Sequence, residues 1–213
     1  MPANLMMNHF DEWAATYDNE LQAEWAKFPF AGYETVLATI VNLVLKSGAT
    51  RMLDLGMGTG TIASQVMEAR PGIDVWGIDF SEQMLARAKK KAPRAHLIQA
   101  DLDQDLMQLV LPSFNAIVAS YVLHELPDEK KAAIIVHLLE HRLESRGLLA
   151  IGDIAFASAT QLSDIRQAEV ERWDDDEHYF IADEFLQYMR KQGIEGNYVQ
   201  LSMCAGVFTF NNR

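Results

Sequence analysis

The chain has 213 residues, 49 % of them hydrophobic, and its 30 acidic and 18 basic residues give a net charge of −12. A chain of this size and apolar content is expected to fold as one globular domain with an ample core. Its acidity disfavours a nucleic-acid substrate, which is bound mainly by Lys and Arg facing phosphates. The same charge disfavours docking on an anionic membrane.

The compartment is predicted from cysteine use and from the distribution of apolar residues. One cysteine, Cys204, excludes an internal disulfide and suits a reducing compartment. The first residues show no basic segment followed by an apolar core, so we expect no signal peptide. No apolar run approaches the length of a membrane-spanning helix. These features predict a cytoplasmic protein that does not enter a membrane.

The N-terminal part, residues 4–48, is predicted to be helical and is unusually aromatic. Four of its large apolar side chains are spaced four, three and four residues apart, which places them on one helix face. They are Met6, Phe10, Trp13 and Tyr17. Part of this face must pack on the domain, and we expect the segment to act as a lid.

The stretch from Met52 to Gly60 is the most informative in the chain. An apolar run containing Asp54 is followed by three glycines at every second position, and helical spacing begins at Thr61. A strand, a glycine loop and a helix start bring backbone close to a nucleotide-like ligand at the end of a parallel sheet. Glycine suits such a loop because a Cβ atom would hold the ligand away. The three glycines are Gly56, Gly58 and Gly60.

Two registers fit this loop, and they imply different ligands. A dinucleotide fingerprint would begin at Gly58 and end at the small Ala63. Its glycines would then start three residues after the strand, and Asp54 would lie unfavourably beside a pyrophosphate. In the other register Gly56 follows the strand at once, and Asp54 suits a ligand with cationic groups and no phosphates. S-adenosylmethionine (SAM), with its ammonium and sulfonium, is such a ligand.

Later strands repeat the pattern of an acid at the strand end. Val75–Asp79 and His96–Asp101 are predicted strands that end in carboxylates, and Asn115–Ser120 is a fourth strand. Asp79 follows Asp54 by 25 residues and precedes Asp101 by 22. A carboxylate at the position of Asp79 can accept both hydroxyls of a ribose, although a dinucleotide fold would use it similarly.

The remaining predicted elements alternate between helices and strands and then end in two consecutive strands. Helices are predicted from Ser81 to Lys91, from Asp128 to Leu143, from Ala159 to Trp173 and from Asp183 to Gln192, and a fifth strand from Leu148 to Asp153. Alternation through the first five strands indicates a parallel sheet with helices on both faces. Asn197–Met203 and Ala205–Phe210 are joined too tightly for a helical crossover, so they must form an antiparallel hairpin. A dinucleotide dehydrogenase of this type would usually lack that hairpin.

With these motifs in this order, the chain resembles the class I SAM-dependent methyltransferases, in particular the small uncharacterised bacterial members. The resemblance implies a Rossmann-like, doubly wound, mostly parallel seven-stranded sheet that ends in an antiparallel hairpin strand. It implies SAM as methyl donor and S-adenosylhomocysteine (SAH) as product. Residues 1–213 would form one domain, with a lid (1–48), a cofactor-binding core (50–155), and substrate-wall helices with the terminal hairpin (156–213).

The resemblance also assigns roles to individual residues. The glycine loop would cradle the methionine part of SAM, with Tyr17 near its carboxylate. Asp79 would bind the ribose, and Asp101 would contact the adenine amino group. The full set of cofactor-binding residues implied is Tyr17, Asp54, Gly56, Met57, Gly58, Gly60, Asp79, Phe80, Met84, Asp101, Leu102 and Ser120.

Methyl transfer from SAM requires few catalytic groups of the protein. The reaction is an in-line displacement with a good leaving group, so alignment and exclusion of water can carry much of the catalysis. A general base is optional. His124 is the best candidate base and Tyr121 flanks it, while a structural hydrogen bond or an adenosine contact is an equally good interpretation of His124. Asp153 would orient substrate or cap the next segment.

The acidic run Asp174–His178 is interpreted as a solvated loop, because consecutive residues do not easily converge on one ion. We therefore expect no metal. The adjacent Tyr179–Ile181 segment is expected to reach the acceptor pocket. The favoured function is methyl transfer from SAM to a small-molecule acceptor. A SAM- or SAH-binding protein that makes no transfer, or one that makes another SAM-derived product, is the alternative, and an NAD-dependent oxidoreductase is less favoured.

Overall fold

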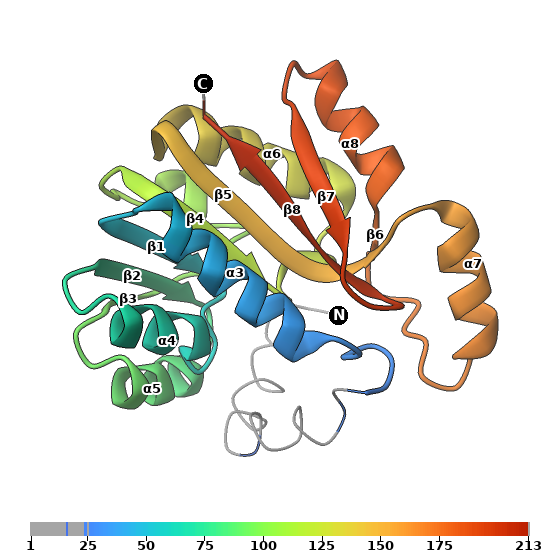
Figure 1. The fold of residues 1–213 in the computed structure, drawn as a ribbon, viewed down its shortest axis with the longest axis horizontal. Helices are drawn as coiled ribbons and strands as arrows, with labels where there is room; N and C mark the ends of the chain where they lie inside the picture. The colour runs from blue at the N-terminus through green and yellow to red at the C-terminus, as the bar shows by residue number, and fades with distance from the viewer. Residues whose placement is uncertain (1–15, 17–23, 25, 213) are drawn as a thin grey trace.

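The computed structural model describes Thr16, Glu24 and residues 26–212, arranged around one twisted sheet (Figure 1). The strands are β1 (Arg51–Leu55), β2 (Asp74–Asp79), β3 (His96–Gln99), β4 (Phe114–Ser120), β5 (Leu143–Phe156), β6 (Phe180–Ile181), β7 (Gly196–Gln200) and β8 (Ala205–Asn211). The helices are α3 (Tyr33–Ser47), α4 (Thr61–Ala69), α5 (Glu82–Lys91), α6 (Asp128–His141), α7 (Ala159–Ala168) and α8 (Ala182–Lys191), with single 3-10 turns η1 (Leu106–Gln108) and η2 (Leu123–Glu125).

The sheet has the order β3-β2-β1-β4-β5-β8-β7, and the two-residue β6 pairs with β5 outside this path. β8 is antiparallel to both of its neighbours, whereas β1 to β5 are parallel to one another. The tight turn before β8 is closed by Leu201 and Ser202, whose amides donate to the carbonyl of Ala205 over 2.9 and 3.1 Å. The predicted Rossmann-like sheet with a terminal antiparallel hairpin is confirmed, with β6 as an additional eighth strand.

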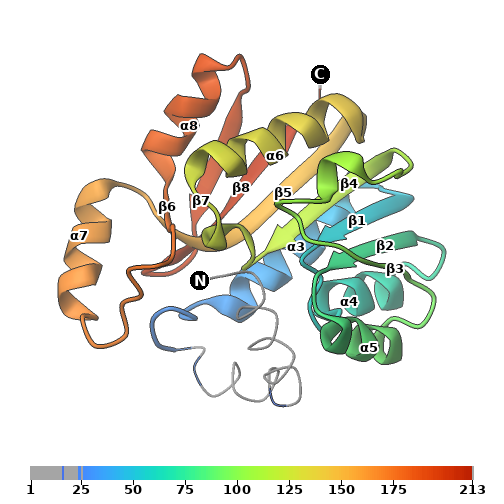
Figure 2. The ribbon, with the colours of Figure 1, turned by 180° about the vertical axis from the view of Figure 1, so that it is seen from behind.

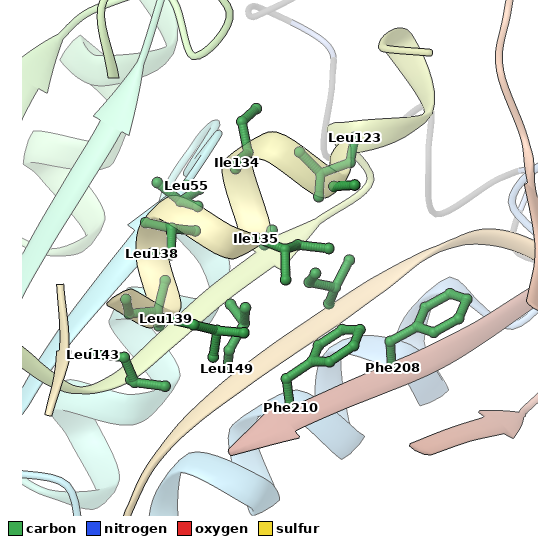
Figure 3. Close-up of a cluster of buried hydrophobic side chains, with 14 of the residues drawn as sticks. Leu55, Leu123, Ile134, Ile135, Leu138, Leu139, Leu143, Leu149, Phe208 and Phe210 are labelled. Atoms are coloured by element: carbon green, nitrogen blue, oxygen red, sulfur yellow. The ribbon is translucent and has the colours of Figure 1, made fainter. Parts of the chain in front are cut away.

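Helices cover both faces of the sheet, as the view from behind also shows (Figure 2). Helices α3, α4 and α5 pack on one face and α6 and α8 on the other. Figure 3 shows Ile135 of α6 pointing toward Leu149 of β5 and Phe210 of β8, and Leu138 of α6 beside Leu55 of β1. Full burial of each such side chain stabilises the fold by roughly 1.5–3 kcal/mol, so the sheet is held firmly against its helices and its strand ends are fixed in space.

Several predicted boundaries are wrong. Helix α6 ends at His141, and β5 already begins at Leu143. Helix α7 ends at Ala168, five residues before Trp173. The indole of Trp173 instead stacks on Phe28, with ring centroids 5.4 Å apart, and meets the Tyr179 ring edge-on at 4.8 Å. This aromatic packing outweighs the local helical pattern.

The N-terminal prediction is only partly covered by the structure. Met6, Phe10, Trp13 and Tyr17 lie outside the described residues. Residues 26–32 form turns and not the predicted helix, which begins at Tyr33. In the described part of the chain, no helix combines the length and apolar character that crossing a bilayer requires.

Candidate functional site

The glycine loop lies where β1 ends and α4 begins, and its backbone adopts the left-handed region. Gly56 has φ +60° and Gly58 has φ +53°. A Cβ atom on Gly56 would lie 2.5 Å from Cγ2 of Val122, so this position is closed to any side chain. A Cβ atom on Gly58 would meet no atom within 4 Å, because the residue faces open space. The first glycine is therefore needed for packing and the second borders an opening.

Two adjoining hollows lie along this loop and share Gly56, Gly58 and Ser120. The first is otherwise lined by Tyr33, Leu37, Asp54, Met57, Thr59, Thr61 and Ile62. The second is otherwise lined by Asp79, Phe80, Met84, Tyr121, Val122 and Glu125. Nine of the predicted cofactor residues are thus brought to one place or directly beside it, with Gly60 capping α4 next to the loop.

Asp54, a predicted cofactor-binding residue, is the buried acid of the first hollow. Its side chain is 1 % exposed, and neither carboxylate oxygen has a hydrogen-bond partner among the described residues. Burial, together with the negative charge of Asp79, raises the pKa of Asp54 to about 8. A buried carboxyl without a partner is costly, so the position favours a ligand that brings a cationic group to it.

Asp79 holds the loop against the start of α5. Its Oδ2 accepts a hydrogen bond from the amide of Gly58 over 2.7 Å, and its Oδ1 accepts one from the amide of Ser81 over 2.9 Å. Ser81 in turn caps α5, with its Oγ accepting from the amide of Met84 over 3.1 Å. Asp79 also lines the second hollow, so its carboxylate lies beside that space.

Asp101 and Leu102 do not line either hollow. Strand β3 ends at Gln99, and Asp101 turns back on its own loop. Its oxygens accept from the amide of Asp103 over 2.8 Å and from Nε2 of Gln104 over 3.0 Å. Contact of Asp101 and Leu102 with a cofactor stays a prediction. The same holds for Tyr17, which lies outside the described residues.

His124 is fixed by a buried carboxylate from the neighbouring strand. Its Nδ1 lies 2.6 Å from Oδ1 of Asp153, and Asp153 is fully buried. Asp153 also accepts from the amides of Leu123 and Ile154, over 2.9 and 2.8 Å. Burial alone would lower the pKa of His124, but the charge and hydrogen bond of Asp153 outweigh it and raise the pKa to about 9. The imidazole is therefore held in one orientation and protonated near neutral pH.

Tyr121 begins the segment after β4 in a strained conformation, with φ +51°. Its ring lies 4.7 Å from that of Tyr33 between centroids, and its buried hydroxyl has no hydrogen-bond partner among the described residues. Burial raises the pKa of Tyr121 well above its ordinary value, so the hydroxyl keeps its proton. Strain of this kind, beside a hollow, is typical of functional sites.

Comparison with known proteins agrees with this arrangement. A family model described as a methyltransferase domain matches residues 52–142. An uncharacterised methyltransferase of Bacillus mycoides (strain KBAB4) is 33 % identical over 151 residues, which are 70 % of this chain and 66 % of that protein. A relative in Bacillus cytotoxicus is 33 % identical over 150 residues, covering 69 % and 66 %. The chain belongs to the methyltransferases.

Solved structures show the same fold. The magnesium protoporphyrin IX methyltransferase of Synechocystis PCC 6803, with bound SAH, matches with a TM-score of 0.71 and 15 % identity over 99 % of both chains. The DhpI–SAH complex matches with a TM-score of 0.66 and 17 % identity, covering 95 % of this chain and 93 % of that one. Both of these structures hold SAH, and this chain covers 66 %, just under two thirds, of the length of the curated relatives.

The sequence did not reveal that residues 174–179 would dock beside His124. The amide of His178 donates to the carbonyl of His124 over 2.7 Å. Lys131 of α6, with no exposed side-chain surface, donates from Nζ to the carbonyl of His178 over 2.5 Å and to Asp128 over 2.8 Å. Its Nζ also lies 4.0 Å from the ring centroid of Phe180. In the sequence, this contact is indicated only by Lys131 itself, a lysine among the apolar residues of the buried face of α6.

Lys131→Met should lower the free energy of unfolding by about 1–3 kcal/mol, because the carbonyl of His178 loses its buried donor. Lys130→Met is the matched control: Lys130 is an exposed neighbour on the same helix that pairs with Asp103, and its loss should cost no more than about 1 kcal/mol. Urea denaturation of the two variants measures the difference. Equal effects would show that Lys131 does not anchor the segment.

Proposed function

We propose that this methyltransferase transfers the methyl group of SAM to a small-molecule acceptor. The observation that carries the proposal is the buried, unpartnered carboxyl of Asp54 at the base of the first hollow. This group suits the ammonium of SAM, whereas a dinucleotide would bring its negatively charged pyrophosphate to the glycine loop. The open space at Gly58 leaves room for the ligand beside the loop backbone.

The residues of the two hollows fit the parts of SAM. Asp54 and the glycine loop would hold the methionine part, Asp79 the ribose hydroxyls, and Phe80 with Met84 the adenine. When bound, SAM supplies an activated methyl group with a neutral thioether as leaving group. The protein would then contribute alignment of the acceptor and exclusion of water.

The acceptor would approach past Tyr121, Val122 and Glu125, the part of the second hollow farthest from the glycine loop in sequence. His124 follows Val122 closely in this segment, so its imidazole would help to orient an acceptor oxygen or nitrogen. A net charge of −12 and the confined hollows favour a small acceptor over a nucleic acid. The magnesium protoporphyrin IX methyltransferase, of similar fold, is named for such a small acceptor.

Two measurements test the proposal. Calorimetry with SAM, SAH and NADH should give saturable binding of SAM and SAH and much weaker binding of NADH; tighter binding of NADH would overturn the assignment. Methyl transfer from labelled SAM should then be followed across a panel of small hydroxyl, amine and thiol acceptors. Binding of SAM with no transfer to any acceptor would support the alternative of a SAM-binding protein without this activity.

Asp79→Ala should weaken SAM binding by roughly 1.5–3 kcal/mol, because a charge-assisted acceptor is lost. Asp74→Ala is the matched control, since Asp74 begins the same strand that Asp79 ends and pairs with Arg51 at the far edge of the sheet. Calorimetry should show SAM affinity unchanged in the control. Unchanged affinity in Asp79→Ala as well would remove Asp79 from the cofactor site.

A further inference from the structure

We propose that His124, Glu125 and Glu177 form a binding site for one divalent transition-metal ion at the acceptor end of the second hollow. Binding of the ion does not depend on the proposed function, whereas its role in orienting the acceptor rests on it. Glu125 lines the hollow itself, so the site is open to the same ligand that enters there.

The three side chains come together from two distant parts of the chain. Oε1 of Glu125 lies 3.8 Å and Oε1 of Glu177 lies 3.9 Å from Nε2 of His124. One ligand atom from each of the three residues lies within 4.8 Å of the others. In a metal site with bonds of about 2.0–2.2 Å, neighbouring ligand atoms are roughly 3 to 3.5 Å apart. Small rotations of the two glutamate side chains, with release of the proton on Nε2 of His124 to solvent, would therefore close the site.

Two independent observations indicate that a ligand belongs here. Oε2 of Glu177 is buried beside the hydroxyl of Tyr179, and it makes no hydrogen bond of ordinary length to a described residue. His124 is 7 % exposed, and its Nδ1 is engaged by Asp153 at 2.6 Å, which directs Nε2 toward the two glutamates. A histidine whose second nitrogen is held by a carboxylate is the usual arrangement around a bound metal.

The donor set favours a transition metal. One imidazole and two carboxylates suit Mn²⁺ or Zn²⁺ better than Ca²⁺ or Mg²⁺, which prefer oxygen ligands alone. The expectation that this protein holds no metal rested on the ligands that the acidic run Asp174–His178 could offer by itself. In the structure only Glu177 of that run turns toward His124, and its partners are on η2.

The site deepens the proposed function by favouring one class of acceptor. A bound ion would ligate a hydroxyl or carboxyl oxygen and ease loss of its proton to solvent. That oxygen would form the new bond to the methyl carbon as the sulfur–methyl bond of SAM breaks, with the electron pair remaining on the sulfur of SAH. The acceptor class is therefore a small molecule with an oxygen nucleophile.

The test is a titration of the full chain with Mn²⁺ after treatment with a chelator, followed by calorimetry and electron paramagnetic resonance. The wild type should bind one Mn²⁺ per chain. Glu177→Gln and Glu125→Gln should each weaken binding at least about tenfold. Asp176→Asn removes the same charge from an exposed neighbour of Glu177 and should bind as the wild type does.

Thermal unfolding of each variant confirms that it is folded before its affinity is compared. No saturable Mn²⁺ binding by the wild type, or equal affinities for Glu177→Gln and Asp176→Asn, would overturn the proposed site. SAM affinity is measured separately in chelator. If the wild type binds SAM but no Mn²⁺, this inference alone is contradicted. If it binds Mn²⁺ but no SAM, the proposed function is contradicted.

Discussion

SAM affinity should rise about tenfold per pH unit between about pH 6 and about pH 8 and then level off. The reason is the buried carboxyl of Asp54, whose pKa is raised to about 8 by burial and by Asp79. Below that pH the free protein keeps Asp54 protonated, and the proton must leave before the carboxylate can pair with the ammonium of SAM. Calorimetry in buffers of different ionisation enthalpy would show both the affinity change and the proton released.

Asp54→Asn should separate binding from stability. In the wild type the folded state binds the Asp54 proton more tightly than the unfolded chain does, because its pKa is about 8 in the fold and near 3.8 ordinarily. The free energy of unfolding therefore falls as pH rises from about 4 to about 8, by up to about 1.4 kcal/mol per pH unit. The Asn variant should lack this decline while binding SAM weakly at every pH.

The matched control for Asp54 is Asp164→Asn, which removes an exposed carboxylate on α7 far from the loop in sequence. Urea denaturation at pH 5 and pH 8 should give the same pH slope for this control and the wild type. If Asp54→Asn also keeps that slope and retains the pH dependence of SAM affinity, then Asp54 is not the group that titrates.

Gly58→Ala should abolish most SAM binding with only a moderate loss of stability. A side chain at φ +53° costs about 1–2 kcal/mol, but the added Cβ meets no protein atom and enters the space left for the ligand. Crowding of this kind typically costs about 1–3 kcal/mol, so SAM affinity should fall roughly ten- to hundredfold.

Gly48→Ala provides a closely matched comparison. Gly48 follows α3, has φ +75°, and its Cβ position is equally open, but it does not line the two hollows beside the glycine loop. Both variants should therefore unfold at similarly lowered temperatures, while only Gly58→Ala loses affinity for SAM. Equal SAM affinities in the two variants would assign Gly58 a structural role alone.

The cofactor side of the site could be predicted because its signals are local in sequence. Asp54, Asp79 and the glycines stand directly at strand ends, and parallel strands bring their carboxyl ends to one edge of a sheet. The terminal hairpin could be predicted for a similar reason, since the short link before Ala205 permits no crossover. Asp101 shows the limit of this reasoning, because its own turn satisfies its carboxylate.

The acceptor side could not be predicted in this way because it depends on contacts between distant segments. His124 and Asp153 are paired by the register of β4 against β5, which no local pattern specifies. Glu177 reaches His124 only because Lys131 and the short β6 hold its segment in place. Helix α7 ends early for the same reason, since Trp173 packs against Phe28 from the start of the described chain.

The length of β5 has a consequence for redesign of this enzyme. The strand continues past Asp153 to Phe156, where Ala155 and Phe156 pair with Phe180 and Ile181 of β6. Both ends of the segment between β5 and α8 are therefore paired with each other, and Trp173 and His178 are anchored between them. Replacing the exposed Val170 and Glu171 should therefore leave the pairing of β5 with β6 unchanged. Sequence changes in this exposed part of the segment are thus separable from the glycine loop and the two hollows beside it.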